Sequence, residues 1–325
     1  MILVCGGLAD VVTELFCARL EDLKYDYRLL NLGLFPEGYK VYWHWEGDKP
    51  GGVISTSDWS LNLDEVSGVF VRYIGSDGHQ PIAGIPNELQ ELAIAESQAG
   101  LAALLEDLSC PIANRSAGAL SNNSKPYQAL LVRETSLLPP PTLITSDPQA
   151  AMEFYEELRG EVIFKSLSGV RSIVRKMAPE DLKRLSFVSH SVTQFQAFLP
   201  GDNVRVHTVG SEIFATRIRS EVVDYRYAKR QGGEAVMEAA ELPAEIANAC
   251  LRLAGKLDLL IAGIDLKQTP DGAWYCFEIN PSPGFAYYEQ RTGQPISAAL
   301  AGLLRGESHP RRLSRAANHS QFTAN

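Results

Sequence analysis

The stretch AGIDLKQTPDGAWYCFEINPSPGF, from Ala262 to Phe285, reads as a β-hairpin. Two strand-like segments flank Asp271-Gly272, and Asp-Gly is the strongest two-residue hairpin signal. A two-residue turn here pairs position 270 with 273 and 268 with 275, which places Asp265 directly opposite Glu278. Asn280 lies two residues further along the strand, so its side chain is expected on the same face.

This register gathers two carboxylates and an amide on one strand face. Like charges directly opposite each other destabilise a sheet, and a cation between them would remove that cost. Mg²⁺ is usually held by one or two carboxylates together with substrate phosphates. An exposed face with its charges splayed into water is the alternative, and the hairpin alone does not decide. The apolar continuation PSPGFAYYE favours a site wall, and Tyr275, Phe277 and Ile279 are expected to form the core face.

The composition is that of an ordinary globular chain of 325 residues, with 45% apolar and 21% charged residues. The net charge of −9 argues against binding to nucleic acid or to an anionic membrane surface, because both require a positive field. No apolar run approaches the roughly 20 residues of a membrane span, and the start MILVCGG does not resemble a secretory signal. Five scattered cysteines fit neither a zinc site nor a disulfide framework, which favours a cytoplasmic location.

The order of strands and helices predicts a mixed α/β and α+β protein. Strands and helices alternate in the first part, which is typical of a parallel sheet, whereas the part after Val192 is rich in strands and turns. The predicted division is an N-terminal α/β domain over 1–112, a central subdomain over 113–191, a C-terminal subdomain with the metal residues over 192–308, and a flexible tail over 309–325.

Several cations are candidates for phosphate contacts. Lys165 ends an apolar strand before a Ser/Gly loop, and Lys125 opens a helix, where backbone N–H groups also favour anions. Arg205 and Arg217 lie on apolar strands, where charged residues are seldom present for packing alone, and Arg217 is expected on the same strand face as Ala215. Arg226 lies in the polar loop DYRYAKRQGG, and a solvated loop arginine is its plain interpretation.

The order of these segments is specific. It runs through Lys125, Lys165, QFQAFLPGDNVRV, FATRIRS, DYRYAKRQGG, GID and FEINPSPGF. This order resembles the ATP-grasp carboxylate–amine ligases, in particular the ribosomal-protein glutamate ligase and glutathione synthetase branch. The end of the chain is also similar to the graspetide (microviridin-type) peptide ligases. The resemblance covers residues 110–305 and implies an ATP-grasp fold preceded by an N-terminal α/β pre-grasp domain.

The resemblance implies a role for each matching residue. Lys125 and Lys165 would contact the phosphates of ATP, and Arg217 and Arg226 would bind the terminal phosphate or an acyl phosphate. Asp265, Glu278 and Asn280 would hold Mg²⁺, for which Mn²⁺ is a substitute. The nucleotide's adenine and ribose would lie along a hinge strand and its neighbour, formed by Gln196, Ala197, Phe198 and Asn203.

The implied activity is an ATP-dependent, ADP-forming ligation. A substrate carboxylate would be activated as an acyl phosphate and joined to an amine or hydroxyl acceptor, on an amino acid or a peptide. Three alternatives stay open, namely a small-molecule phosphotransferase on the same frame, a non-catalytic ATP-binding protein and a plain two-domain structural protein. Two departures from the family stand out: few glycines follow Lys165, and Ala228 replaces a frequent asparagine. Oligomeric state is not readable, and a homodimer is the common default.

Overall fold

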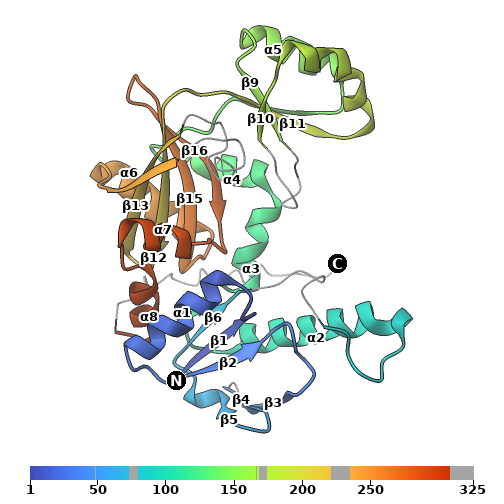
Figure 1. Ribbon diagram of the computed structural model, residues 1–325, viewed down its shortest axis with the longest axis vertical. Helices are drawn as coiled ribbons and strands as arrows, with labels where there is room; N and C mark the ends of the chain where they lie inside the picture. Colours follow the sequence, from blue (N-terminus) through green and yellow to red (C-terminus); the bar gives the residue numbers. More distant parts are fainter. Residues whose placement is uncertain (48, 73–79, 166, 168–173, 221–234, 308–325) are drawn as a thin grey trace, which may run out of the picture.

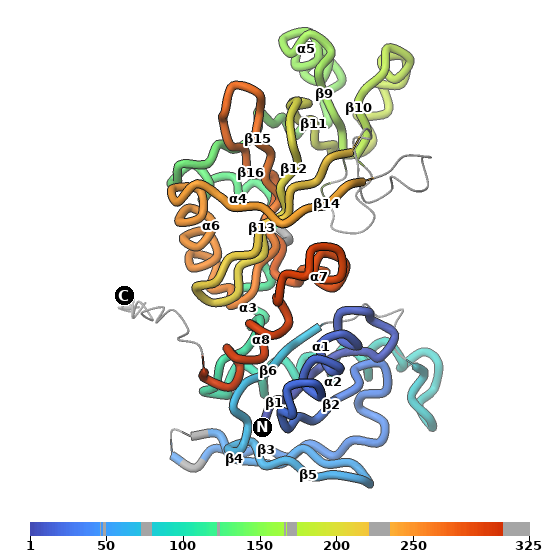
Figure 2. Tube along the Cα trace, turned by 60° about the vertical axis from the view of Figure 1, so that its left-hand side comes forward, coloured from blue at the N-terminus to red at the C-terminus, as the bar shows by residue number. Residues whose placement is uncertain are grey.

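The structure is a computed structural model that describes residues 1–325 except 48, 73–79, 166, 168–173, 221–234 and 308–325. Three units are stacked along the long axis of the molecule (Figure 1). The N-terminal unit lies at one end, a five-stranded sheet lies in the middle, and a small four-stranded sheet lies at the other end. Figure 2, turned by 60°, shows the same order.

The N-terminal unit is built on a parallel sheet of order β2-β1-β6-β7, as the alternation of strands and helices predicts. Asp10 caps the first helix by accepting a hydrogen bond from the backbone N–H of Thr13. A three-stranded antiparallel sheet, β3-β4-β5, was not predicted. The elements are β1 (Ile2–Gly6), α1 (Val11–Asp22), β2 (Tyr27–Asn31), β3 (Lys40–Glu46), β4 (Lys49–Ser55), β5 (Ser60–Asn62), η1 (Leu63–Glu65), β6 (Gly68–Val71), α2 (Asn87–Asp107) and β7 (Ile112–Ala113).

The small sheet is antiparallel and has the order β10-β9-β11-β8. Its outer face, which carries Phe164 and Phe195, packs with residues of α5 and η4 in a hydrophobic cluster of its own. The elements are β8 (Thr142–Thr145), α5 (Pro148–Glu157), β9 (Val162–Lys165), β10 (Arg175–Lys176), η4 (Pro179–His190) and β11 (Thr193–Ala197).

The middle sheet is antiparallel and has the order β14-β13-β12-β15-β16. Helices α4 and α6 pack on one of its faces. Helix α4 begins at Lys125, as the sequence predicts, with Ser124 as its cap and Pro126 in its first turn. The elements are α3 (Ser116–Ala119), η3 (Leu120–Asn123), α4 (Lys125–Val132), β12 (Asp202–Val209), β13 (Glu212–Ser220), β14 (Ala235–Ala240), α6 (Ala244–Lys256), β15 (Ile261–Gln268), β16 (Trp274–Asn280), α7 (Ala286–Thr292) and α8 (Ile296–Arg305).

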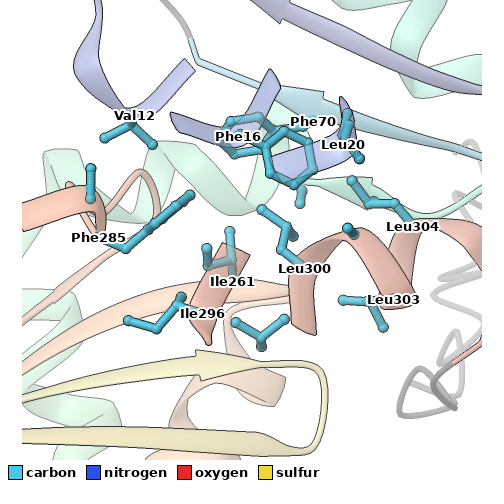
Figure 3. Packing of buried hydrophobic residues seen from close by; sticks show 14 of the residues in the cluster. Val12, Phe16, Leu20, Phe70, Ile261, Phe285, Ile296, Leu300, Leu303 and Leu304 are labelled. Carbon is cyan, nitrogen blue, oxygen red and sulfur yellow. The ribbon is translucent and has the colours of Figure 1, made fainter. Parts of the chain in front are cut away.

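The N-terminal unit and the middle sheet share one hydrophobic core (Figure 3). The ring of Phe70 in β6 lies 4.7 Å from that of Phe16 in α1 and 6.2 Å from that of Phe285, just after β16. Helix α8 fills the space between the units with Leu300 and Leu304, which are fully buried. Because this core is continuous, the N-terminal unit is fixed relative to the β15–β16 hairpin.

The pairing of β11 with the small sheet places the second domain boundary later in the chain than predicted. The prediction divides the chain between 191 and 192, but β11 pairs with β8 and β9 of the small sheet. The chain passes to the middle sheet only after Ala197. Helix α4, which was predicted with the central subdomain, packs against β16. The predicted tail at 309–325 lies outside the described residues.

No helix in the described part of the chain combines the length and apolar character needed to cross a membrane. All five cysteines are free thiols, and four of them are buried.

Candidate functional site

The β15–β16 hairpin brings the predicted metal residues together. Asp265 pairs with Glu278 and Gly263 pairs with Asn280, as the sequence predicts. The turn is not the predicted two-residue turn, because the backbone N–H of Thr269 donates to the carbonyl of Ala273 and encloses three residues. Gly272 takes the positive φ of 88° that this turn requires. The longer loop shifts the first pairs of the hairpin by one residue, so Gln268 faces Trp274 and not Tyr275.

A β-bulge at Phe277 restores the register at the carboxylates. Leu266 pairs with Cys276 while Asp265 pairs with Glu278, which leaves Phe277 as the extra residue. The expectation that Tyr275 and Phe277 share the core face with Ile279 is therefore wrong. Trp274, Cys276 and Ile279 belong to the buried cluster instead, because the bulge reverses the alternation of side chains along β16.

Two cations contact the two carboxylates. Arg205 of β12 donates from Nη1 to Oδ1 of Asp265 at 2.7 Å, and its side chain is 7% exposed. Nζ of Lys125, at the first residue of α4, lies 4.0 Å from Oε1 of Glu278, and the lysine side chain is 6% exposed. These two contacts use one oxygen of each carboxylate. We call the side of the middle sheet that carries Arg205, Asp265, Glu278 and Asn280 the carboxylate face.

The donor set on the carboxylate face fits Mg²⁺. Two carboxylates and one amide offer hard oxygen ligands from adjacent strands, and Mg²⁺ characteristically takes few protein ligands and keeps water or phosphate oxygens. Among the described residues, no group of three His, Cys, Asp or Glu side chains is arranged to hold a metal ion. A zinc-type site therefore has no support in this part of the chain, whereas the set Asp265, Glu278 and Asn280 remains a magnesium candidate.

The end of β16 is held by two buried amides that sequence reasoning missed. Gln128 of α4 makes two hydrogen bonds to the backbone of Ile279, donating to its carbonyl at 2.7 Å and accepting from its N–H at 3.0 Å. Asn114 donates to the carbonyls of Ile261 and Pro281. The only sequence signal was a polar residue on the buried side of α4, where Leu131 and Val132 lie.

The inner face of the small sheet carries polar side chains. It bears Lys165, Gln194 and Gln196, on the side opposite Phe164 and Phe195. Gln196 donates from Nε2 to Oγ1 of Thr142 at 2.9 Å. The Oε1 atoms of Gln194 and Gln196 are buried and have no hydrogen-bond partner within the described residues. Two unpaired buried acceptors on one face are costly unless a ligand or water donates to them.

A cavity of about 480 Å³ lies over this inner face. Its lining includes Gln194 and Gln196 from the small sheet, Lys125 from α4, and Glu278 from β16. Proline residues 139–141 and apolar side chains of α4 complete much of the wall. A space of this size, lined by apolar side chains together with convergent polar and charged groups, has the character of a small-molecule site.

The predicted hinge residues border the inner face. The N–H groups of Ala197 and Phe198 donate to the carbonyls of Pro141 and Glu161, so they are used within the fold. The Phe198 ring lies 4.5 Å from Nζ of Lys176 and 5.7 Å from Nζ of Lys267. Burial lowers the pKa of Lys267 below its usual value, and the charge of Asp202 partly offsets this.

The structure does not bring Arg217 to the carboxylates. Arg205 pairs with Thr216 on β13, and alternation along the strand therefore turns Arg217 to the face opposite the carboxylate face. There Arg217 donates to Asp202 at 2.8 Å, and it shares the strand face with Ala215 as the sequence predicts. Asn203 pairs with Lys267 at the outer end of the carboxylate face. Arg226 and Ala228 lie outside the described residues.

Comparison with known proteins identifies the family and the fold. The sequence profile of the RimK-like ATP-grasp domain matches residues 121–304, more than half of the chain. A probable α-L-glutamate ligase of Shewanella amazonensis is 26% identical over 110 residues, covering 34% of this chain and 36% of that protein. The chain therefore matches only about a third of this curated relative.

Two solved structures match over nearly the whole chain. One is the macrocyclase MdnC of Microcystis aeruginosa, bound with the precursor peptide MdnA. Its TM-score is 0.79 at 26% identity, with 95% of this chain and 100% of that chain covered. The other is the ATP-grasp ligase PsnB with a precursor variant, Mg and ADP. Its TM-score is 0.75 at 25% identity, with 93% and 98% covered. The predicted ATP-grasp fold is thereby confirmed, and the chain belongs to the RimK-like ATP-grasp family.

Proposed function

We propose that this protein is an ATP-dependent ligase that activates a carboxylate as an acyl phosphate and joins it to an amine or a hydroxyl of a peptide. The observation that carries the proposal is the pair Asp265 and Glu278, which lie in register. Glu278 lies beside Lys125, and these two residues line the cavity over the inner face. Ligase activity is common to the relatives named above. The peptide substrate is proposed because MdnC and PsnB were both solved with precursor peptides.

The nucleotide would lie between the two sheets. Its base would enter the cavity over Gln194 and Gln196, whose buried acceptors match a base amino group. Lys125 and Lys165 would contact the phosphates, with Gln196, Ala197, Phe198 and Asn203 along the base and ribose. Burial of both lysines strengthens their attraction for phosphate, because the local dielectric is low.

Mg²⁺ would be held by Asp265, Glu278 and Asn280, and Mn²⁺ would serve in its place. Bound there, the ion would neutralise charge on the phosphates. Arg205 holds Asp265 in place from the neighbouring strand. The predicted phosphate contacts of Arg217 and Arg226 stay predictions, since one lies on the opposite face and the other outside the described residues.

The reaction balances without a protein nucleophile. A carboxylate oxygen would attack the γ-phosphorus of ATP, and the bond from that phosphorus to the β-phosphate oxygen would break to release ADP. An amine or hydroxyl would then attack the acyl carbon, lose its proton to solvent or a base, and expel phosphate. The protein's part is to align the reactants and stabilise the charge on the transferred group.

The remaining parts of the proposal concern the whole molecule. We keep the division into N-terminal, central and C-terminal units, with the second boundary placed after Ala197. We also propose a cytoplasmic location, which five free thiols support, and a homodimer as the assembly.

The test has two stages. Calorimetry with Mg²⁺ and ADP should first show binding. The protein is then incubated with Mg²⁺, ATP and synthetic peptides that carry Asp or Glu together with Lys, Ser or Thr. ADP release with loss of one water from a peptide supports ligation. ADP release with a phosphorylated product indicates a phosphotransferase, and binding without turnover over a broad set of carboxylates indicates a non-catalytic ATP-binding protein.

A further inference from the structure

Arg72, at the carboxyl end of the parallel sheet in the N-terminal unit, reaches across to the loop after β16. Its Nη1 donates to the carbonyl oxygen of Ser282 at 2.9 Å and to the Ser282 hydroxyl at 2.7 Å. The same guanidinium grips Asp10 with two bonds, from Nε at 3.1 Å and from Nη2 at 3.0 Å. Four of its five N–H groups are therefore used within the protein.

Asp10 fixes the position of the guanidinium. It caps α1 through the backbone N–H of Thr13, so its carboxylate is tied to a regular element. Burial would raise the pKa of Asp10, but the hydrogen bonds and charge of Arg72 hold it below its ordinary value. A carboxylate that stays ionised keeps the bidentate grip, which is the strongest form of an arginine contact. Arg72 is thus held in one orientation before it meets Ser282.

Ser282 in turn orients Asn280. The backbone N–H of Ser282 donates to Oδ1 of Asn280 at 2.9 Å, forming the local turn in which an asparagine side chain binds the residue two positions on. This bond fixes the carboxamide so that the second lone pair of its oxygen has a defined direction. The chain of contacts runs from Asp10 through Arg72 and Ser282 to Asn280.

We propose that Arg72 is a positioning residue by which the N-terminal unit completes the metal site. The inference rests on the proposed function, since it assigns Asn280 to the metal. The shared core around Phe70 and Phe285 makes the N-terminal unit a rigid support for this contact. Arg72 acts on the ion through Ser282 and Asn280 and does not itself touch the phosphates or the substrate carboxylate.

A matched control exists at the same interface. Arg19 of α1 also crosses from the N-terminal unit, where it binds Glu289 of α7 at 3.2 Å and the hydroxyl of Ser297 at 3.1 Å. It makes no described contact with the loop after β16. Removing Arg19 therefore costs an ion pair between the units but leaves Ser282 and Asn280 as they are.

The experiment compares R72A, R72K, R19A and the wild type as full-length proteins. Mn²⁺ binding with saturating ADP is measured by electron paramagnetic resonance, ADP binding without metal by calorimetry, and unfolding by circular dichroism. We expect R72A to weaken Mn²⁺ binding roughly 10-fold, the scale of an outer-shell partner, with metal-free ADP binding unchanged. R72K should recover only part of this loss, because lysine lacks the fork that reaches Asp10 and Ser282 together. R19A should lower the unfolding midpoint without changing Mn²⁺ affinity.

One contrary result is that R72A binds Mn²⁺ as tightly as the wild type, and that both R72A and R19A differ from the wild type in stability alone. That result would overturn the inference and leave the proposed function intact. Equal loss of Mn²⁺ affinity in R72A and R19A would also overturn it, because the effect would then be a general loosening of the interface. A wild type that binds neither Mn²⁺ nor ADP would remove the proposed function and the inference together.

Discussion

Asp265 and Glu278 face each other across β15 and β16 although the hairpin between them is irregular. A three-residue loop displaces the register by one, and the bulge at Phe277 returns it. The loop and the bulge thus cancel, and the pair keeps the register that a regular two-residue turn would give. Two carboxylates kept opposite each other, with Arg205 and Lys125 against them, are the arrangement expected of a cation site.

Replacing Glu278 by Gln should remove turnover. The substitution keeps the shape of the side chain but removes the charge that faces Asp265, so the proposed Mg²⁺ would lose one of its two anionic ligands. ADP release should fall by about 10²–10³-fold or more, the scale of a lost electrostatic contact to a transferred group. Circular dichroism should show an unchanged fold, because the Glu278 side chain is 29% exposed.

Glu238→Gln is the matched control. Glu238 also lies on an outer strand of the middle sheet, but it pairs with Arg219 on the opposite face, and both side chains are about half exposed. Exposed ion pairs of this kind contribute little, so turnover and stability should stay at the wild-type level. Equal loss of activity in both variants would contradict the assignment of Glu278.

Local signals in the sequence predicted most of the helices and strands, but features that depend on contacts between distant residues were not predicted. The start of α4 at Lys125 was predicted correctly, because the start of a helix depends on a few neighbouring residues. The position of Asp265 opposite Glu278 was predicted correctly from a turn that does not form, since the longer loop and the bulge cancel. A bulge depends on how Trp274 and Cys276 pack into the core, and that packing is set by distant elements.

The site residues show the same division. That Arg217 shares a strand face with Ala215 follows from alternation alone and is confirmed. The face of the sheet that carries Asp265 depends on how β12 pairs with both β13 and β15. No local sequence pattern predicts that pairing. The bond from Arg205 to Asp265 joins residues 60 apart, and that from Arg72 to Ser282 joins residues 210 apart.

Gly263→Ala should disturb the site through Arg205. A Cβ at position 263 would lie 2.7 Å from Cζ of Arg205 and 2.7 Å from Cβ of Pro283. The buried guanidinium would have to move away from Asp265, and such overpacking costs about 1–3 kcal/mol. Urea unfolding measures the cost. Gly284→Ala is the control, since nothing lies within 4 Å of a Cβ there. Similar losses of stability in both variants would show that the loop after β16, and not the displacement of Arg205, causes the loss.

Arg217→Ala tests whether the opposite face takes part in turnover. In the described structure Arg217 contacts Asp202 and lies away from Asp265, so the direct electrostatic loss should be small. We expect ADP release to fall by less than about 10-fold, well short of the loss expected for Glu278→Gln. A loss as large as that of Glu278→Gln would support the family role predicted for Arg217 and would require the middle sheet to rearrange on binding nucleotide.

The buried His207 should make the protein less stable in mild acid. Burial holds the pKa of His207 well below its ordinary value of 6.5, and the charge of Arg205 lowers it further. Its ring packs against Tyr288 at 4.9 Å, and neither nitrogen has a hydrogen-bond partner in the described part of the chain. Below pH 6.5 the imidazole of His207 binds a proton in the unfolded chain but stays neutral in the folded protein. Stability is therefore full above that pH and is lost as the pH falls, by up to about 1.4 kcal/mol per unit until the folded pKa is reached.

Asparagine at position 207 separates this effect from general acid sensitivity. His207→Asn removes the titrating ring, so the slope of unfolding free energy against pH between 7.5 and 5.5, from urea titrations, should become shallower whatever the absolute stability of the variant. His190→Asn changes an exposed histidine at the end of η4 and should leave the wild-type slope. An unchanged slope in His207→Asn would mean that His207 is protonated within the fold, and the packing of Arg205 and Tyr288 around it would then have to differ from that described here.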